Sequence, residues 1–211
     1  MRTKYKAWSV PYLEEHKEIA ISIEHANDII INNDNVVLEI GSGKGDFLLQ
    51  MAQKYPNLIF IGIEKNVTCS GFTCKKLVEN EITNAFIVDA DVEKCFPIFA
   101  KERIKYIFLN FSDPWPKKKH AKRRLTETKF LNSYYELLTK GGKIYFKSDN
   151  QNLFDYSILT LSKAPFNILS LDNNYDGHDE FDAQTEYERN FRNQGVAIHR
   201  VIVEKKEDKN V

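Results

Sequence analysis

Short apolar runs alternate with longer polar and amphipathic stretches along most of the chain. Compact apolar runs are typical of buried strands, and apolar positions three and four residues apart are typical of helices. The pattern predicts strands over residues 36–40, 58–63, 85–88, 104–111, 142–146 and 197–203. It predicts helices over residues 47–54, 67–79, 127–138 and 153–163.

Strands that alternate with helices predict an α/β fold, with a mostly parallel sheet covered by helices on both faces. Residues 197–203 alternate in polarity late in the chain, so we expect an antiparallel strand at one side of the sheet. In such sheets ligands bind at the carboxyl ends of the strands. We therefore expect the functional residues to converge on that edge.

A glycine-rich turn follows the first predicted strand, with the pattern Glu39-x-Gly41-x-Gly43-x-Gly45. Glycines allow a tight turn and let a ligand lie against bare backbone at the start of a helix. A dinucleotide fingerprint would place its third glycine where this chain has Asp46, which disfavours a nicotinamide enzyme. A cofactor without pyrophosphate fits the pattern, and an ordinary glycine turn is the alternative.

Acidic residues follow the next two strands. Glu64 ends the second strand about twenty residues after the turn, where a carboxylate can accept both ribose hydroxyls. Asp89 and Asp91 follow the third strand, and either could accept an adenine amino group. Their spacing does not choose between them. The glycine-rich turn and the acids that follow it in this order predict a site for an adenosine-containing cofactor.

A proline-rich turn ends the fourth strand, in which Asp113 precedes Pro114-Trp115-Pro116. Prolines fix the backbone and end the strand ladder, so we expect a rigid turn that presents the Asp113 carboxylate. Six of the eight residues from Lys117 to Arg124 are Lys or Arg. This run predicts a phosphate-binding patch that brings a nucleic-acid base to Asp113, with affinity that falls as salt rises. A solvated loop is the alternative.

The amino-acid composition restricts the functional classes and the cellular compartment that remain compatible with these motifs. Thirty basic and thirty acidic residues cancel, which excludes a globally basic nucleic-acid binder and leaves a local patch. Cys69, Cys74 and Cys95 form no CxxC pair, which favours a reducing compartment. We find no apolar leader and no run that is long enough to span a membrane, so we expect a cytoplasmic protein.

The length of the chain, 211 residues, predicts a single domain over residues 1–211. Within it we expect residues 1–30 to form an N-terminal extension and residues 205–211 to form a frayed tail.

Together these motifs resemble the bacterial tRNA (guanine-N7-)-methyltransferase family, whose members are class I S-adenosylmethionine-dependent methyltransferases. The resemblance covers nearly the whole chain and is most specific over residues 110–118, 119–124 and 185–188. It implies a Rossmann-like, seven-stranded sheet, S-adenosyl-L-methionine as cofactor and tRNA as partner. The implied reaction is methylation of N7 of guanosine 46 in the tRNA variable loop.

The resemblance also implies roles for individual residues, and it selects Asp91 over Asp89. Implied cofactor-binding residues are Glu39, Gly41, Gly43, Glu64, Asp91 and Asp113. Implied substrate-binding residues are Lys117, Asp149, Thr185, Glu186, Tyr187 and Glu188. Implied RNA contacts are Lys119, His120, Ala121, Lys122, Arg123 and Arg124. We further expect Asp113 to be catalytic, because its turn lies between the cofactor acids and the basic run.

Guanine N7 exposes a lone pair, so this chemistry requires neither a metal nor a catalytic Cys or His. The sequence contains no cluster with metal-ligand spacing. Two alternatives stay open: another S-adenosylmethionine-dependent base methyltransferase that acts on an exocyclic amine, and a noncatalytic RNA-binding protein on the same scaffold. We expect a monomer or a homodimer, and the sequence leaves any other protein partner unknown.

Overall fold

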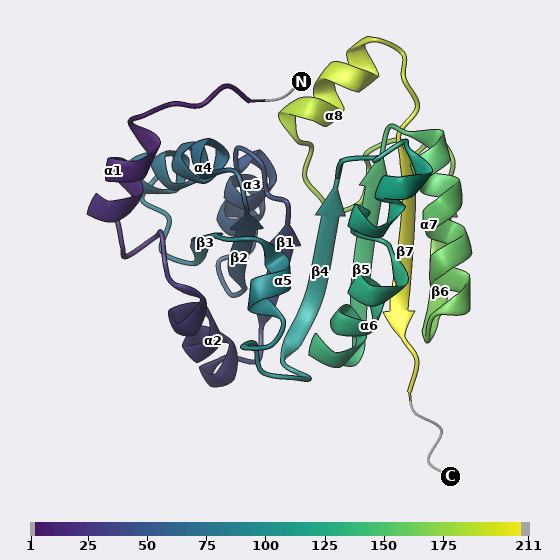
Figure 1. Ribbon diagram of the computed structural model, residues 1–211, viewed down its shortest axis with the longest axis horizontal. Helices are drawn as coiled ribbons and strands as arrows, with labels where there is room; N and C mark the ends of the chain where they lie inside the picture. The colour runs from purple at the N-terminus through teal and green to yellow at the C-terminus, as the bar shows by residue number, and fades with distance from the viewer. Residues whose placement is uncertain (1–2, 208–211) are drawn as a thin grey trace.

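A seven-stranded sheet runs through the computed structural model, which describes residues 3–207 (Figure 1). Its strands lie in the order β3-β2-β1-β4-β5-β7-β6. Their bounds are β1 Val36–Ile40, β2 Ile59–Glu64, β3 Ala85–Asp89, β4 Ile104–Asn110, β5 Leu138–Ser148, β6 Phe166–Asp172 and β7 His199–Lys205.

The first five strands pair in parallel, and β7 lies antiparallel between β5 and β6. The expected α/β fold with a mostly parallel sheet and an antiparallel C-terminal strand is therefore confirmed. The helices and one 3-10 helix are α1 Ser9–Glu15, α2 Ile23–Asn32, α3 Asp46–Lys54, α4 Val67–Glu79, α5 Val92–Cys95, η1 Lys118–Arg123, α6 Thr128–Leu137, α7 Gln151–Lys163 and α8 Glu186–Asn193.

Alternate residues of each strand face two separate hydrophobic clusters, as the pleat of a strand requires. In β1, Leu38 and Ile40 join the cluster formed with α2, α5, α6 and α7. Val36 joins that cluster too. Val37, between Val36 and Leu38, joins the opposite cluster with α1, α3 and α4. Both faces of the sheet are thus covered by helices.

Two strands differ clearly from the sequence-based prediction, and helices α1, α2, α5 and α8 were not among the predicted helices. Strand β6 was not predicted, because it is an edge strand whose Ile168, Leu169 and Leu171 are all exposed and follow no alternating pattern. Strand β5 begins at Leu138, and the Gly141-Gly142 pair lies inside it, where the register with β4 shifts. The glycines therefore form an irregularity within the strand and do not precede it.

The described part of the expected N-terminal extension packs against the sheet. Ala20 forms a parallel bridge with Ile87 of β3, and Ile21 N donates to Ile87 O at 3.0 Å. Residues 1–2 and 208–211 of the expected extension and tail lie outside the described residues, and β7 runs to Lys205. Within residues 3–207, no helix has the length and apolarity to cross a membrane.

The three cysteines are free and buried. Burial raises the pKa of Cys74 and of Cys95 to about 12, so neither thiol ionises at neutral pH. These side chains act as small apolar residues of the core.

A buried ion cluster joins β5 to α8 and to the loop before it. The Lys147 ammonium lies 2.8 Å from both carboxylate oxygens of Asp182 and 2.8 Å from Oε2 of Glu188. These side chains are at most 6% exposed. Arg192 donates to the other Glu188 oxygen, at 2.7 Å. The cluster holds α8 beyond the carboxyl ends of the strands (Figure 1).

Replacing Lys147 with Met should leave the carboxylates of Asp182 and Glu188 buried without their partner. We expect the free energy of unfolding to fall by about 3–5 kcal/mol. Lys75→Met, which breaks an exposed pair with Glu79, is the matched control and should change it by less than about 1 kcal/mol. Urea unfolding measures both, and equal midpoints for the two variants would contradict the prediction.

Candidate functional site

Four of the predicted acids lie at the carboxyl ends of neighbouring parallel strands. Glu64 is the last residue of β2, and Glu39 is the residue before the last in β1. Asp113 follows β4 by three residues, and Asp149 directly follows β5. Because β2, β1, β4 and β5 are adjacent in the sheet, the structure brings these acids to one edge.

The glycine turn between β1 and α3 depends on left-handed backbone. Gly41, Gly43 and Gly45 have φ of 76°, 56° and 76°, values that glycine adopts without strain. A Cβ on Gly45 would lie 2.6 Å from Thr73, whereas one on Gly43 would have no heavy atom within 4 Å. The turn is therefore packed at α3 and open at Gly43.

Glu64 ties this turn to β2. Its carboxylate oxygens accept the backbone N–H of Gly43 at 3.0 Å and of Asn66 at 2.8 Å. Burial raises the pKa of Glu64, and these two hydrogen bonds oppose the shift. Each carboxylate oxygen has two lone pairs, so Glu64 keeps acceptor capacity for a ligand.

Glu39 is a buried acid with one oxygen unused. Asn110 Nδ2 donates to Glu39 Oε1 at 3.0 Å, while Glu39 Oε2 and Asn110 Oδ1 have no partner. Burial raises the pKa of Glu39 to about 8, against the lowering effect of Asn110 and Lys147. Two adjacent buried acceptors without donors are rare in folded proteins and mark a place where a ligand could supply the donors.

The two aspartates after β3 both have structural partners. Asp89 pairs in register with Glu64 and accepts the Ser70 hydroxyl at 2.8 Å. Asp91 caps α5 by accepting the backbone N–H of Glu93 at 3.1 Å. Both residues are exposed, so the geometry leaves the choice between them open.

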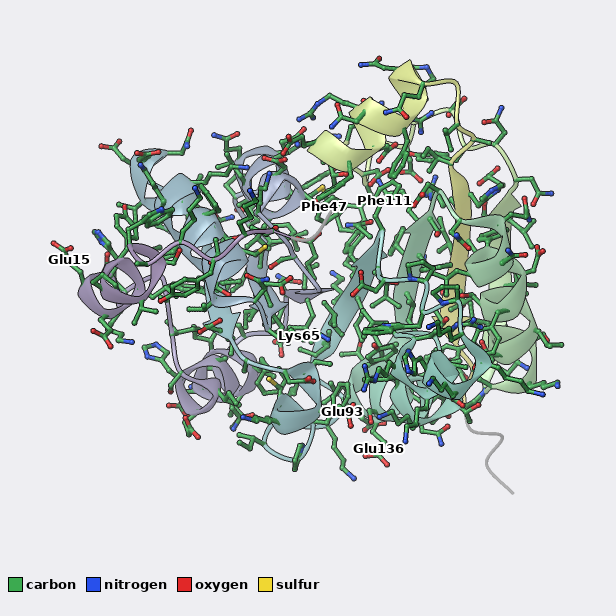
Figure 2. All side chains as sticks on the ribbon, turned by 45° about the horizontal axis from the view of Figure 1, so that its top comes forward. Glu15, Phe47, Lys65, Glu93, Phe111 and Glu136 are labelled. Carbon is green, nitrogen blue, oxygen red and sulfur yellow. The ribbon has the colours of Figure 1, made fainter. Side chains whose placement is uncertain are left out.

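The turn that carries Asp113 is strained on both sides. Phe111 and Trp115 have φ of 51° and 42°, a region that non-glycine residues seldom adopt. The Phe111 ring stacks 6.1 Å from Phe191 of α8, and Figure 2 shows Phe111 close to that helix. Asp113 itself is exposed at the sheet edge. Strain of this kind persists only where the surroundings hold it, and it clusters at functional sites.

The basic run forms the 3-10 helix η1 directly after this turn. Lys117, Lys118, Lys119, Lys122 and Arg123 are exposed, and His120 and Ala121 are half-buried. Arg124 differs from them because its guanidinium donates to the carbonyls of Pro114 and Trp115, at 3.0 and 3.2 Å.

In the predicted substrate segment 185–188, two residues are buried and two are exposed. Thr185 caps α8 through the Glu188 N–H at 3.0 Å, and Glu188 belongs to the Lys147 ion cluster. Glu186 and Tyr187 are exposed, and Glu186 lies 3.5 Å from the Lys44 ammonium.

Asp149 is half-buried, and burial raises its pKa while the nearby His199 lowers it.

Sequence reasoning assigned no role to Asn110 or Lys147, although both lie at this edge. A lysine directly after the apolar run Ile144-Tyr145-Phe146 was a usable signal, because a buried ammonium requires carboxylate partners. Within residues 3–207, no group of three or more His, Cys, Asp or Glu could hold a metal ion.

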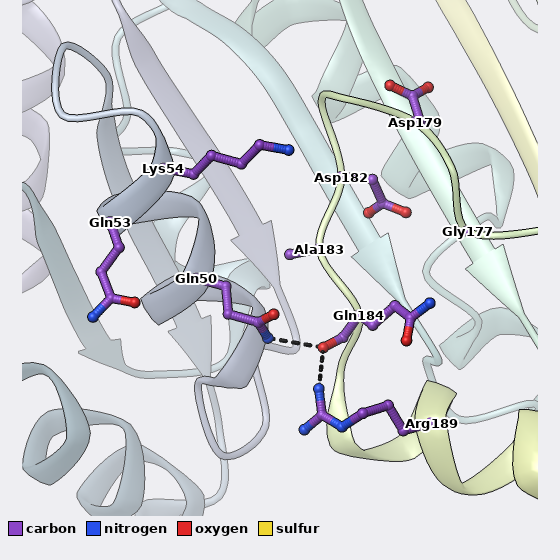
Figure 3. A pocket seen from close by; sticks show the side chains of 9 residues that line it. All are labelled: Gln50, Gln53, Lys54, Gly177, Asp179, Asp182, Ala183, Gln184 and Arg189. Carbon is purple, nitrogen blue, oxygen red and sulfur yellow. Dashed lines mark hydrogen bonds between the residues drawn. The ribbon is translucent and has the colours of Figure 1, made fainter.

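A polar hollow of about 640 Å³ lies elsewhere, between α3 and the segment before α8 (Figure 3). The donors of Gln50 and Arg189 converge there on the Gln184 carbonyl, at 2.8 and 2.7 Å. None of the predicted site residues lines it. These two hydrogen bonds brace the segment before α8 against α3.

Comparison with known proteins agrees with this geometry. Residues 33–201 match a family model described as putative methyltransferase. Among solved structures, an antibiotic-related methyltransferase superposes with a TM-score of 0.66 at 17% identity, covering 90% of this chain and 96% of its own. A 16S rRNA (adenine(1408)-N(1))-methyltransferase from Catenulisporales acidiphilia gives a TM-score of 0.62 at 9% identity, covering 90% and 94%. These likenesses confirm the class I, Rossmann-like fold.

Curated relatives are much closer in sequence. A tRNA (guanine-N(7)-)-methyltransferase of Oceanobacillus iheyensis is 39% identical over 95% of this chain and 97% of its own length. One of Macrococcus caseolyticus is 40% identical over 95% and 98%. This chain belongs to the tRNA (guanine-N(7)-)-methyltransferase family.

Proposed function

We propose that this chain methylates N7 of guanosine 46 in the variable loop of tRNA, with S-adenosyl-L-methionine as the methyl donor. One arrangement of residues supports this function. The half-buried Glu64 and the buried Glu39 lie at the carboxyl ends of β2 and β1, and the neighbouring strand β4 leads into the Asp113 turn and the basic helix η1. A reaction of this kind takes place in the reducing cytoplasm, which fits the free cysteines.

The residues at the edge fit the cofactor. The partnerless oxygens of Glu39 and Asn110 are acceptors for its donor groups, and Glu64 keeps lone pairs for ribose hydroxyls. Gly43 leaves open space beside the turn. When bound, S-adenosyl-L-methionine supplies a methyl group on a positively charged sulfur. Gly41 and Asp91 complete the proposed cofactor contacts.

Methylation of guanine N7 requires little chemistry from the protein's side chains. Guanine N7 carries a free lone pair, so no side chain has to remove a proton first. Orientation then supplies most of the rate, and the Asp113 carboxylate stabilises the positive charge that develops on the base. A carboxylate also accepts guanine N1–H and the 2-amino group, which adenine cannot offer in that arrangement.

The substrate contacts divide by exposure. We assign direct contacts with the base and its nucleotide to Lys117, Asp149, Glu186 and Tyr187. Thr185 and Glu188 serve the same segment by capping and anchoring α8. The exposed lysines and Arg123 of η1 bind tRNA phosphates, next to His120 and Ala121.

Asp113→Ala removes the carboxylate from the strained turn. We expect kcat for methyl transfer to tRNA to fall by about 10²-fold or more, because the developing charge loses its partner. Asp155→Ala, an exposed acid on α7, is the matched control and should keep wild-type turnover. Labelled-methyl transfer to unmodified tRNA measures this, with mapping of the labelled base. Full turnover by a folded Asp113→Ala enzyme would refute the role.

The triple variant Lys118→Gln, Lys119→Gln, Lys122→Gln removes three exposed charges from η1. We expect the KM for tRNA to rise and the dependence of log(kcat/KM) on log salt to flatten by about two units, as fewer counterions are released. The matched control is a second triple variant with the same change in charge away from this edge: Lys101→Gln, Lys140→Gln, Lys143→Gln. Identical salt slopes for the two triple variants would rule the contact out.

Glu39 gives the cofactor-free protein a pH dependence. Its pKa is about 8 when folded and 4.5 as a free group, so the folded state retains this proton longer. The stabilisation is complete below about pH 4.5 and is lost as pH rises through 8, on the order of 5 kcal/mol. Glu39→Gln should remove this loss. Urea unfolding between pH 4 and 9 measures it, and parallel profiles for the two proteins would contradict it.

A further inference from the structure

The backbone around Asp113 needs restraint at both ends. Left-handed φ values at Phe111 and Trp115 are unfavourable for residues with a Cβ, so the turn relaxes unless other contacts fix it. Its upstream end is fixed, since Phe111 N donates to Lys147 O of β5 at 2.9 Å. Downstream, Pro114 and Pro116 have no N–H to donate. Hydrogen bonds to these two prolines therefore have to be accepted by their carbonyl oxygens.

Arg124 supplies that restraint. Its Nε donates to Pro114 O at 3.0 Å, and its Nη2 donates to Trp115 O at 3.2 Å. One planar guanidinium therefore bridges two consecutive carbonyls directly after Asp113. A planar fork fixes the directions of both donors, whereas a lysine ammonium is a compact point charge on a flexible stem.

The guanidinium is itself held in place. It lies over the ring of Tyr156 on α7, 4.3 Å from the centroid, and the Arg124 backbone N–H bonds to Ala121 O at 2.9 Å. Both Arg124 and Tyr156 are half-buried, unlike the neighbouring Lys118, Lys119 and Lys122, which are exposed. Arg124 thus links the Asp113 turn to a helix of the core.

We propose that Arg124 is a positioning residue, which clamps the turn that presents Asp113 and does not serve as a phosphate contact. The basic run then has two parts: exposed cations that meet tRNA, and one arginine that fixes the geometry of the turn. This inference deepens the proposed function and rests on the role of Asp113 in it.

Arg124→Lys keeps the positive charge and loses the fork. We expect kcat to fall at least tenfold, while the KM for tRNA and its salt dependence stay within twofold of wild type. Lys122→Gln is the matched comparison and should show the opposite split, with a higher KM and a kcat within twofold. A raised KM and a preserved kcat in Arg124→Lys would overturn the clamp and make Arg124 a phosphate contact.

Tyr156 provides a second route to the same clamp. Tyr156→Phe keeps the ring under the guanidinium and should keep kcat, whereas Tyr156→Leu should lower it. Combining Tyr156→Leu with Arg124→Lys should lower kcat little further than Arg124→Lys alone, because both changes disable one device. Fully multiplicative losses would show that the two side chains act independently and would overturn the proposal.

Fluorescence separates the clamp from the proposed function. Trp8 and Trp115 are the only tryptophans, so Trp8→Phe leaves Trp115 as the sole reporter within the turn. In that background, without tRNA, Arg124→Lys should shift the Trp115 emission and Lys122→Gln should not. A shift with no methylation by the parent enzyme would support the clamp and reject the proposed function. An unchanged emission in Arg124→Lys would overturn the clamp.

Discussion

Burial of a single ammonium organises the functional edge. Lys147 lies within a central strand, where a charged group is tolerated only if carboxylates come to it. Asp182 and Glu188 supply them, from a loop and a helix that make no strand pairing of their own. The position of α8 over the strand ends follows from this need, and so does the position of Glu186 and Tyr187 on its first turn. The same ammonium also lowers the pKa of Glu39 against the effect of burial.

Polar residues at the edge divide into those that build the site and those left free to act. Glu188, Thr185 and Arg124 satisfy backbone or buried charge. Glu39 and Asn110 each keep an oxygen that can accept a hydrogen bond, and Asp113 is exposed. Unsatisfied acceptors and left-handed turns persist at such a site because the surrounding structure holds them in place.

Most strands, the crossover helices and the acids at the strand tips could be predicted from the sequence, because each signal is local. The predicted ranges 36–40 and 67–79 coincide with β1 and α4. Helix α8 was hidden, since ion pairs and not an apolar stripe hold it. The partners of Lys147 and Arg124 could not be predicted, because they lie 35 and 10 residues away and no local pattern records which residues meet.

Strand β7 has a consequence for how the chain is made. It is the last strand in sequence, yet it sits between β5 and β6, and β6 pairs with β7 alone. Until β7 has been made, β5 has an open flank and β6 has no neighbour. The nascent chain must therefore carry unpaired strand edges on both β5 and β6 until β7 emerges, and contacts between distant residues complete the sheet in one late step.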